Sequence, residues 1–215
     1  MKVAVICEYS GVVRDAFIRA GHDAISFDLL PSESSFGDHI QGDIMQFSQE
    51  YWKQFDLAIC HPPCTHLAVS GAAWFKYKEK EQAEALDFVR YLMNLPISKI
   101  VIENPVSVIS TRIRKPDQII HPWQFGHPEM KTTCLWLKGL QNLTETNNVH
   151  DEMMLLPKNL RERNHYLPPS PDRWKERSRT YQGIADAMAK QWSDPSTDYE
   201  SRNERQISLF ENGPE

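Results

Sequence analysis

Short apolar segments, each followed by polar residues, recur along the chain and limit what it can fold into. They are predicted to be strands: Val3–Ile6, Asp23–Asp28, Asp56–Cys60, Lys99–Ile102 and Thr132–Leu137. The spacing of apolar residues predicts helices at 12–20, 79–95 and 178–192. Strands that are apolar along their whole length and alternate with helices predict an α/β fold, with a mostly parallel sheet covered on both faces.

Polar residues stand at the carboxyl ends of these predicted strands. They are Glu8–Gly11, Asp28, Asp43, Pro62–Cys64 and Glu103–Asn104. In a parallel sheet the carboxyl ends of the strands meet at one edge, and ligands bind outside that edge. We therefore expect these residues to form one functional site.

Chain length favours a single domain with an appendage. The 215 residues correspond to roughly 1.4 average domains, and 40% hydrophobic with 25% charged residues is a globular composition. We expect one domain at residues 1–192, in which 140–177, with four prolines, is a loop region. Residues 193–215, with six acidic residues against two arginines, are predicted to be a disordered acidic tail.

The charge of the chain and its cysteines indicate which partners and which cell compartment to expect. The net charge is -5, so no global basic field marks a nucleic-acid-binding protein, although Lys158–Arg179 holds seven basic residues against three acidic ones. The N-terminal apolar run is too short for a signal peptide, and no segment is long enough to span a membrane. Four cysteines without secretory context indicate reduced thiols, so we expect a cytoplasmic protein.

The segment Pro62-Pro63-Cys64 has the features of a presented nucleophile. Two prolines stiffen the loop, and the thiol stands at a strand end. Glu103 would supply a proton donor or hydrogen-bonding group at the same edge. The alternative is that Cys64 is a small buried apolar side chain. No second Cys or His pair completes a tetrahedral set with Cys60 and Cys64, so no metal site is predicted.

The order of these motifs resembles the DNA cytosine-C5 methyltransferase family, in particular its short phage and prophage forms. The resemblance is carried by Tyr9-Ser10-Gly11, Asp28, Gly42-Asp43, Pro62-Pro63-Cys64 and Glu103-Asn104-Pro105. The later segments Phe125–Lys131 and Tyr181–Gly183 extend it, so that it spans about residues 3–192. It implies a single Rossmann-like methyltransferase domain that uses S-adenosylmethionine.

The resemblance also implies catalytic roles. Cys64 would add to C6 of cytosine, and Glu103 would hydrogen-bond and protonate N3. Asn104 would orient the loop, and Lys131 would stand where the family has an arginine.

The cofactor residues implied by the resemblance lie at the same strand ends. The cofactor would lie over Tyr9, Ser10 and Gly11 and near Pro62. Asp28 would hold its ribose, and Asp43 would lie near its adenine amine.

Target recognition is where the chain departs from the family. Only residues 140–177 are available as a reduced recognition region, which implies weak sequence specificity, help from a partner or another substrate. Arg173, Trp174, Lys175 and Arg177 are candidate DNA contacts, with Trp174 able to stack on a base; an ordinary solvated loop is the alternative. Methylation of a free cytosine nucleotide, or a non-catalytic DNA- or clamp-binding protein of the same fold, remain alternatives to DNA methylation.

The tail contains one apolar segment, Gln206-Ile207-Ser208-Leu209-Phe210. It resembles the peptide by which bacterial polymerases and repair proteins bind the β sliding clamp. Leu209 and Phe210 would fill an apolar pocket, and Gln206 would give a polar anchor. Clamp binding would bring the protein to DNA in the nucleoid; folding back onto the domain is the alternative.

Overall fold

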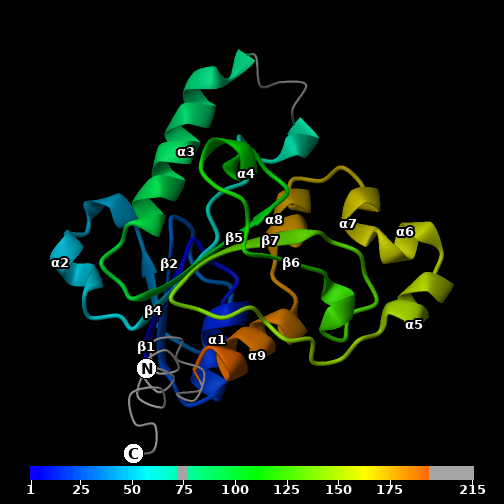
Figure 1. Cartoon of the computed structure of the whole chain (residues 1–215), viewed down its shortest axis with the longest axis horizontal. Helices are drawn as coiled ribbons and strands as arrows, with labels where there is room; N and C mark the ends of the chain where they lie inside the picture. The colour runs from blue at the N-terminus through cyan, green and yellow to red at the C-terminus, as the bar shows by residue number, and fades with distance from the viewer. Residues whose placement is uncertain (72–76, 194–215) are drawn as a thin grey trace, which may run out of the picture.

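The computed structural model of the chain, shown in Figure 1, describes residues 1–71 and 77–193. Its centre is a seven-stranded sheet of order β3-β2-β1-β4-β5-β7-β6 within these residues. The strands are β1 Lys2–Ile6, β2 Asp23–Asp28, β3 His39–Gln41, β4 Leu57–Cys60, β5 Lys99–Pro105, β6 Gln118–Ile120 and β7 Thr133–Lys138. Strands β1 to β5 pair in parallel, and β7 is antiparallel to both β5 and β6. The predicted α/β fold with a mostly parallel sheet is confirmed.

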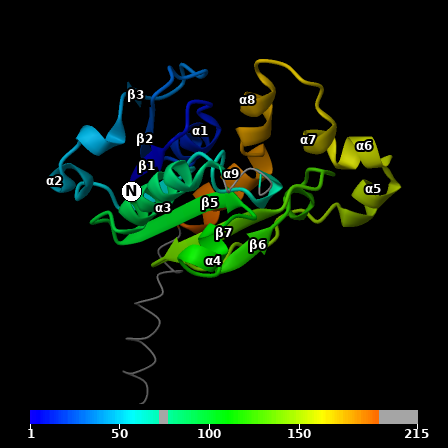
Figure 2. The same cartoon turned by 90° about the horizontal axis from the view of Figure 1, so that it is seen from above.

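Helices pack on both faces of the sheet, as Figures 1 and 2 show. The longer ones are α1 Val12–Arg19, α3 Glu79–Met93 and α9 Gln182–Gln191. The short ones are α2 Gln49–Trp52, α4 Ile109–Arg112, α5 His150–Leu155, α6 Lys158–Arg161, α7 Arg163–Tyr166 and α8 Arg173–Ser178, with 3₁₀ turns η1 Ile44–Gln46 and η3 Pro122–Gln124. No helix of residues 1–71 and 77–193 combines the length and apolar character needed to cross a membrane.

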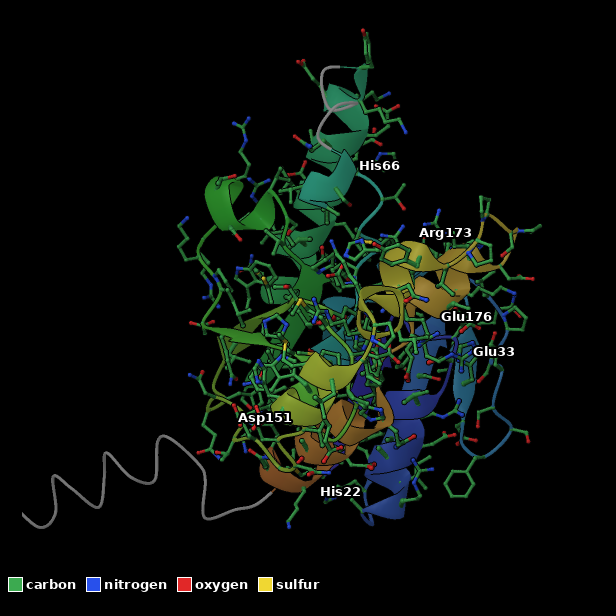
Figure 3. The ribbon with its side chains drawn as sticks, turned by 90° about the vertical axis from the view of Figure 1, so that its right-hand side faces the viewer. His22, Glu33, His66, Asp151, Arg173 and Glu176 are labelled. Atoms are coloured by element: carbon green, nitrogen blue, oxygen red, sulfur yellow. The ribbon has the colours of Figure 1, made fainter. Side chains whose placement is uncertain are left out.

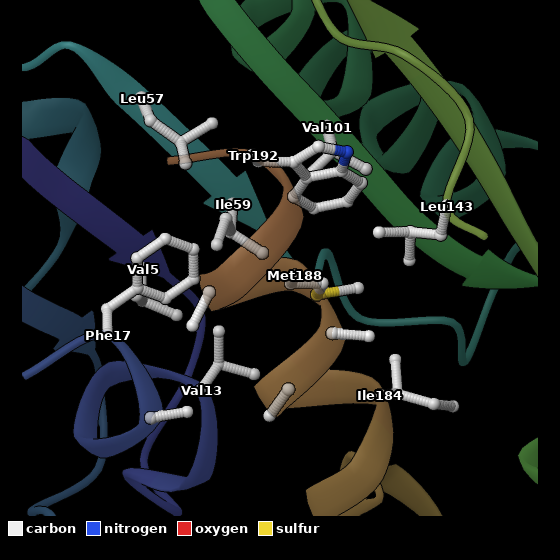
Figure 4. Packing of buried hydrophobic residues seen from close by; sticks show 14 of the residues in the cluster. Val5, Val13, Phe17, Leu57, Ile59, Val101, Leu143, Ile184, Met188 and Trp192 are labelled. Atoms are coloured by element: carbon white, nitrogen blue, oxygen red, sulfur yellow. The ribbon is translucent and has the colours of Figure 1, made fainter. Parts of the chain in front are cut away.

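Each face of the sheet has its own apolar core, which explains why the strands lack an alternating polar pattern. Val5, Ile59 and Val101 point to the side of α1 and α9, where Phe17 and Trp192 complete the core seen in Figure 4. The intervening strand residues point to the other side and pack against α2, α3 and α4. Alternate strand residues face opposite ways, so a strand buried on both sides is apolar at every position.

Strand β5 is longer than the sequence pattern indicated. The predicted strand ended at Ile102, whereas β5 continues through Glu103, Asn104 and Pro105. These residues pair with β7, with Glu103 opposite Leu135 and Asn104 opposite Cys134. The polar residues at this end of β5 therefore take part in the hydrogen-bonded ladder of the sheet.

The segment 140–177 was predicted to be a loop region and instead contains α5, α6, α7 and most of α8. Figures 1 and 2 show α5, α6 and α7 beside one another at the end of the molecule opposite α2. These helices are only four to six residues long, too short for a periodic apolar pattern to reveal them.

Candidate functional site

The loop that presents Cys64 is held to the end of β5 at two places. The buried Asn104 side chain donates a hydrogen bond to the Pro62 carbonyl, with 2.8 Å from Nδ2 to oxygen. Beyond Cys64, Ala68 forms a β-bridge with Ser107. The thiol therefore stands on a loop that is tied at one end to β5, which carries Glu103, and at the other to the segment just after β5.

Replacing Asn104 with alanine is expected to lower the free energy of unfolding by about 1–3 kcal/mol, because the buried Pro62 carbonyl loses its donor. Chemical denaturation of the purified protein measures this change. The control is Ser107→Ala, since the buried Ser107 hydroxyl has no hydrogen-bond partner in the described part of the chain. Equal stability of the two variants would contradict a role for Asn104 in holding the loop.

Glu103 lies at the centre of a charged group at this edge. Its Oε2 is 3.0 Å from Nδ1 of His61, and the two side chains are only 12% and 11% exposed. Burial raises the pKa of Glu103, but the His61 hydrogen bond and the positive charge of Lys131 outweigh it, so that the pKa is lowered overall. Glu103 is therefore ionised in the free protein at neutral pH.

Cys64 experiences the opposite influence. The residue is exposed at the surface, but the protein around its thiol excludes part of the surrounding water. This partial burial raises the pKa of the thiol. The Glu103 carboxylate raises that pKa further, and the charges of Lys131 and Arg177 lower it. Cys64, Glu103 and Lys131, predicted to share a site, thus lie close enough for their charges to interact.

Lys131 is fixed by residues from the C-terminal part of the fold. Its Nζ donates to the Arg179 carbonyl at 3.3 Å and lies 5.8 Å from the centre of the Tyr181 ring. Nearby, Glu129 accepts hydrogen bonds from the Arg163 guanidinium and, at 2.6 Å, from the Tyr181 hydroxyl. Glu129 therefore joins the segment before Lys131 to α7 and to the residues before α9.

A cleft of about 330 Å³ opens beside the loop that presents Cys64, where Pro63 lines it. It is lined by apolar side chains, including Phe27 and Ile44, and by the carboxylates Asp28 and Asp43. Burial raises the pKa of Asp28. Further lining comes from His66 and from α3, and Figure 3 shows His66 beside that helix. An apolar cleft with two carboxylates suits a flat ring joined to a sugar diol.

Cys7 lines the cleft in an unusual backbone conformation. Its φ of 60° is left-handed, and within the described residues every other positive φ belongs to glycine. Such a conformation costs about 1–3 kcal/mol in a residue other than glycine. The end of β1 is thus bent sharply where the chain leaves the sheet toward α1.

The other predicted cofactor residues are not part of the lining. Ser10 is hydrogen-bonded to Glu8, and Gly11 begins α1 beneath the Arg14 side chain. The hydroxyl of Tyr9 is 3.2 Å from Ser178, and its ring is 5.7 Å from that of Trp174. Pro62 is buried, and its neighbour Pro63 reaches the cleft instead.

The predicted DNA contacts lie on α8. Trp174 is half exposed with the Lys175 ammonium 5.8 Å from its ring, whereas Arg173 donates to the His165 carbonyl. Figure 3 shows Arg173 on the same side of the molecule as Glu33, which forms an ion pair with Arg179 just beyond α8. Of these four residues, Arg177 alone lies near enough to Cys64 for its positive charge to lower the pKa of the thiol.

The sequence analysis missed His61 and Arg14, and it placed Glu8 at the edge of the sheet without giving it a role. His61 contacts Glu103, and Glu8 accepts backbone N–H bonds from Val13 and Arg14 at the start of α1, at 2.6 and 3.2 Å. Arg14 is fully buried and bonds to Asp15, Ser26, Ser32 and Ser34. The signal for His61 was its place directly before the two prolines; a buried Arg in an apolar helix face gives no sequence signal.

The structure shows no group of three or more metal-ligating side chains within residues 1–71 and 77–193. The predicted clamp-binding residues Gln206, Leu209 and Phe210 lie outside the described residues, as does nearly all of the acidic tail. Both predictions about the tail therefore stay predictions.

Comparisons with known proteins give structural neighbours only. No protein-family model and no curated protein matches the sequence. Similar solved structures include an E. coli prophage protein assigned as a DNA modification methyltransferase, at 15% identity and TM-score 0.45, covering 74% of this chain and 56% of that one.

Two further neighbours are eukaryotic. One is a Spodoptera frugiperda DNMT2 mutant, at 17% identity and TM-score 0.46, covering 64% of this chain and 49% of that one. The other is the S. pombe Dnmt2 methyltransferase, at 17% identity and TM-score 0.44, covering 82% and 62%. The matched part spans less than two thirds of each of these three proteins. The seven-stranded, mostly parallel sheet is itself what places this chain in the Rossmann-like fold class.

Proposed function

We propose that this protein transfers a methyl group from S-adenosylmethionine to C5 of cytosine in DNA, through a covalent adduct of Cys64. The observation that carries the proposal is the grouping of Cys64, Glu103 and Lys131 at the carboxyl edge of the sheet, beside a cleft with two carboxylates. The sequence resemblance to cytosine-C5 methyltransferases supports the same roles.

The opposite pKa shifts of Cys64 and Glu103 support a proton path. The Cys64 thiol is protonated at neutral pH and Glu103 is ionised, so the carboxylate is able to act as the general base. As sulfur adds to C6, the S–H bond breaks and its proton passes through Glu103 to N3 of the base. The electron pair of the C5=C6 bond moves to the C4–C5 bond, which makes C5 nucleophilic.

The remaining steps restore the aromatic ring. C5 would take the methyl group as the S–CH3 bond of the sulfonium breaks, which leaves a thioether, and would then lose its hydrogen as a proton to solvent. The electron pair of the C5–H bond would re-form the C5=C6 bond and expel the Cys64 thiolate, and the N3 proton would return through Glu103 to that sulfur. Lys131 stabilises the ionised groups of this site throughout, as its charge does for Glu103 and Cys64 in the free protein.

The cleft beside Cys64 fits the proposed cofactor. Its apolar walls would hold the adenine ring, Asp28 the ribose hydroxyls and Asp43 the adenine amine. When bound, S-adenosylmethionine supplies an electrophilic methyl group. The Asp28 carboxylate accepts backbone hydrogen bonds from Leu30, at 2.9 Å to Oδ1, and from Leu29, which orient it at the wall of the cleft.

A cytosine inside a duplex cannot reach Cys64, so it must be flipped out of the stack, which costs a few kcal/mol. Arg177, whose charge acts on the Cys64 thiol, would contact the nucleic acid at the site, and Trp174 and Lys175 on the same helix α8 would contact it farther from the thiol. The short segment 140–177 also supports a second candidate substrate, a free cytosine nucleotide, which needs no base-specific recognition region.

Recruitment by the sliding clamp through Gln206, Leu209 and Phe210 would deliver the enzyme to newly made DNA in the nucleoid and raise its local concentration. This part of the proposal rests on the sequence pattern alone. It is tested by clamp binding of Leu209→Ala with Phe210→Ala; unchanged binding would remove it.

The proposed function is tested with the complete protein, S-adenosylmethionine carrying a labelled methyl group, and either duplex DNA or dCMP. We expect labelled 5-methyldeoxycytidine after digestion of the DNA, measured by mass spectrometry. Label in dCMP but not in DNA would favour the second candidate. No label in either substrate would favour a non-catalytic binding protein and overturn both enzymatic candidates.

A further inference from the structure

His61 is held in place as an extension of strand β4. Its backbone N–H donates to the Ile6 carbonyl at 2.9 Å, so the residue continues alongside β1. From this position the ring reaches across to the neighbouring strand β5, where Nδ1 meets Oε2 of Glu103 at 3.0 Å. The two prolines that follow prevent the chain from turning into a helix at this point.

The His61 ring hydrogen-bonds Glu103 and also lies near the carboxylates that follow β1 and end β2, Glu8 and Asp28. A positive charge on the ring lowers the pKa values of both of those carboxyl groups. Burial dominates for both of those carboxyl groups and raises their pKa values overall. The second ring nitrogen, Nε2, is buried and has no hydrogen-bond partner in the described part of the chain.

Glu103 has few other partners. The positive charge of Lys131 lowers the pKa of Glu103. The negative charge of Glu103 in turn raises the pKa values of the Cys64 and Cys134 thiols. His61 makes the one hydrogen bond to the Glu103 carboxylate that we find in residues 1–71 and 77–193. A buried carboxylate with one oxygen bound is fixed in orientation, and its other oxygen is left to face a ligand.

We propose that His61 is a positioning residue for Glu103, whose ring N–H holds Oε2 so that Oε1 faces the base bound at Cys64. This inference rests on the proposed function. It requires a proton on Nδ1, since only then does the ring donate to the carboxylate; the imidazolium and the neutral tautomer protonated at Nδ1 both meet this condition. His61 does not line the cleft, so its proposed role is exerted through Glu103.

Three substitutions separate this role from a packing role. His61→Leu removes the donor; His61→Asn puts an amide N–H close to the position of Nδ1; His61→Gln carries its amide one bond farther along the side chain. We expect His61→Leu to raise the pKa of Glu103 by about one unit or more, because an interaction that stabilises the charged form is lost. His61→Asn should restore much of the difference, and His61→Gln less.

The first measurement does not depend on activity. Carboxyl ¹³C signals of glutamate-labelled protein are titrated, and the Glu103 signal is assigned by its loss in Glu103→Gln. A Glu103 midpoint in His61→Leu equal to that of the unsubstituted protein would overturn the proposal. If His61→Leu does not fold, the Asn and Gln variants are compared, and equal midpoints would overturn it as well.

The second measurement is the pH profile of methyl transfer. Ionised Glu103 accepts the thiol proton, so activity falls as pH drops through the Glu103 pKa, and raising that pKa moves the acidic limb to higher pH. We expect a shift of about one pH unit in His61→Leu, equivalent to about tenfold lower activity on the acidic side, with rescue by His61→Asn. A uniform loss of kcat at every pH would point to packing and contradict the proposal. If the Glu103 titration shifts in His61→Leu but the unsubstituted protein transfers no methyl group, the positioning role of His61 stands and the proposed function is rejected.

Discussion

Substitution of Cys64 by serine is expected to lower methyl transfer to cytosine by at least about a thousandfold, as removal of a covalent nucleophile does in other enzymes. The serine hydroxyl has nearly the same size but a far higher pKa, so Glu103 is unable to take its proton. The loss should appear in kcat, because the cleft lined by Asp28 and Asp43 is left intact.

The covalent step itself is measured with DNA that contains 5-fluorocytosine. Fluorine at C5 cannot leave as a proton, so the unsubstituted protein should remain attached to the DNA and be found by mass spectrometry. Cys134→Ala, which removes a buried thiol from the same end of the sheet, should still form the adduct. An adduct that persists in Cys64→Ser would place the nucleophile at another residue.

Replacing Gly183 with alanine is expected to lower the free energy of unfolding by about 3 kcal/mol, at the upper end for an overpacked site. A Cβ atom there would stand 1.9 Å from the Phe125 carbonyl oxygen and 3.1 Å from Nε2 of His127, which accepts the Gly183 backbone N–H. Phe125 is itself buried in the core beneath α9, so its backbone has no free space to move into. The midpoint of thermal unfolding should fall by roughly 6–12 °C for a domain of this size.

The matched control for this measurement is Gly42→Ala. A Cβ atom at Gly42 has no neighbour within 4 Å, so stability should change by no more than about 0.5 kcal/mol. If Gly183→Ala proves as stable as Gly42→Ala, the start of α9 does not pack closely against Phe125. The glycine of Tyr181-Gln182-Gly183 is thus explained by close backbone approach rather than by a turn.

The sheet could be predicted from the sequence because burial on both faces leaves a clear apolar signal. Val3–Ile6 and Asp23–Asp28 were located to within one residue, since each strand is continuous and ends at polar residues. Strands β3 and β6, of three residues each, were missed because so short a segment carries no pattern. The antiparallel direction of β7 was equally invisible, since direction depends on how the chain crosses from β5.

The candidate site was predicted in part. Strand ends indicated Cys64, Glu103 and Asp28, because parallel strands bring their carboxyl ends together. Tyr9 and Gly11 follow the same rule, yet Tyr9 packs against α8 and Gly11 under Arg14. These contacts join segments more than 160 residues apart or depend on a buried arginine, and no local pattern encodes them.

The extension of β5 through Glu103 has a consequence for how the site moves. Glu103 and Asn104 belong to a paired strand, opposite Leu135 and Cys134 of β7. Amide groups in such a ladder exchange their hydrogens with deuterated water only when the ladder opens. We expect the amides of this segment to exchange as slowly as those of the central strands, whereas those of α8 exchange within seconds to minutes. We therefore expect the Glu103 carboxylate to be the fixed point of the proposed site, and α8, which carries Trp174 and Arg177, to be its more mobile side.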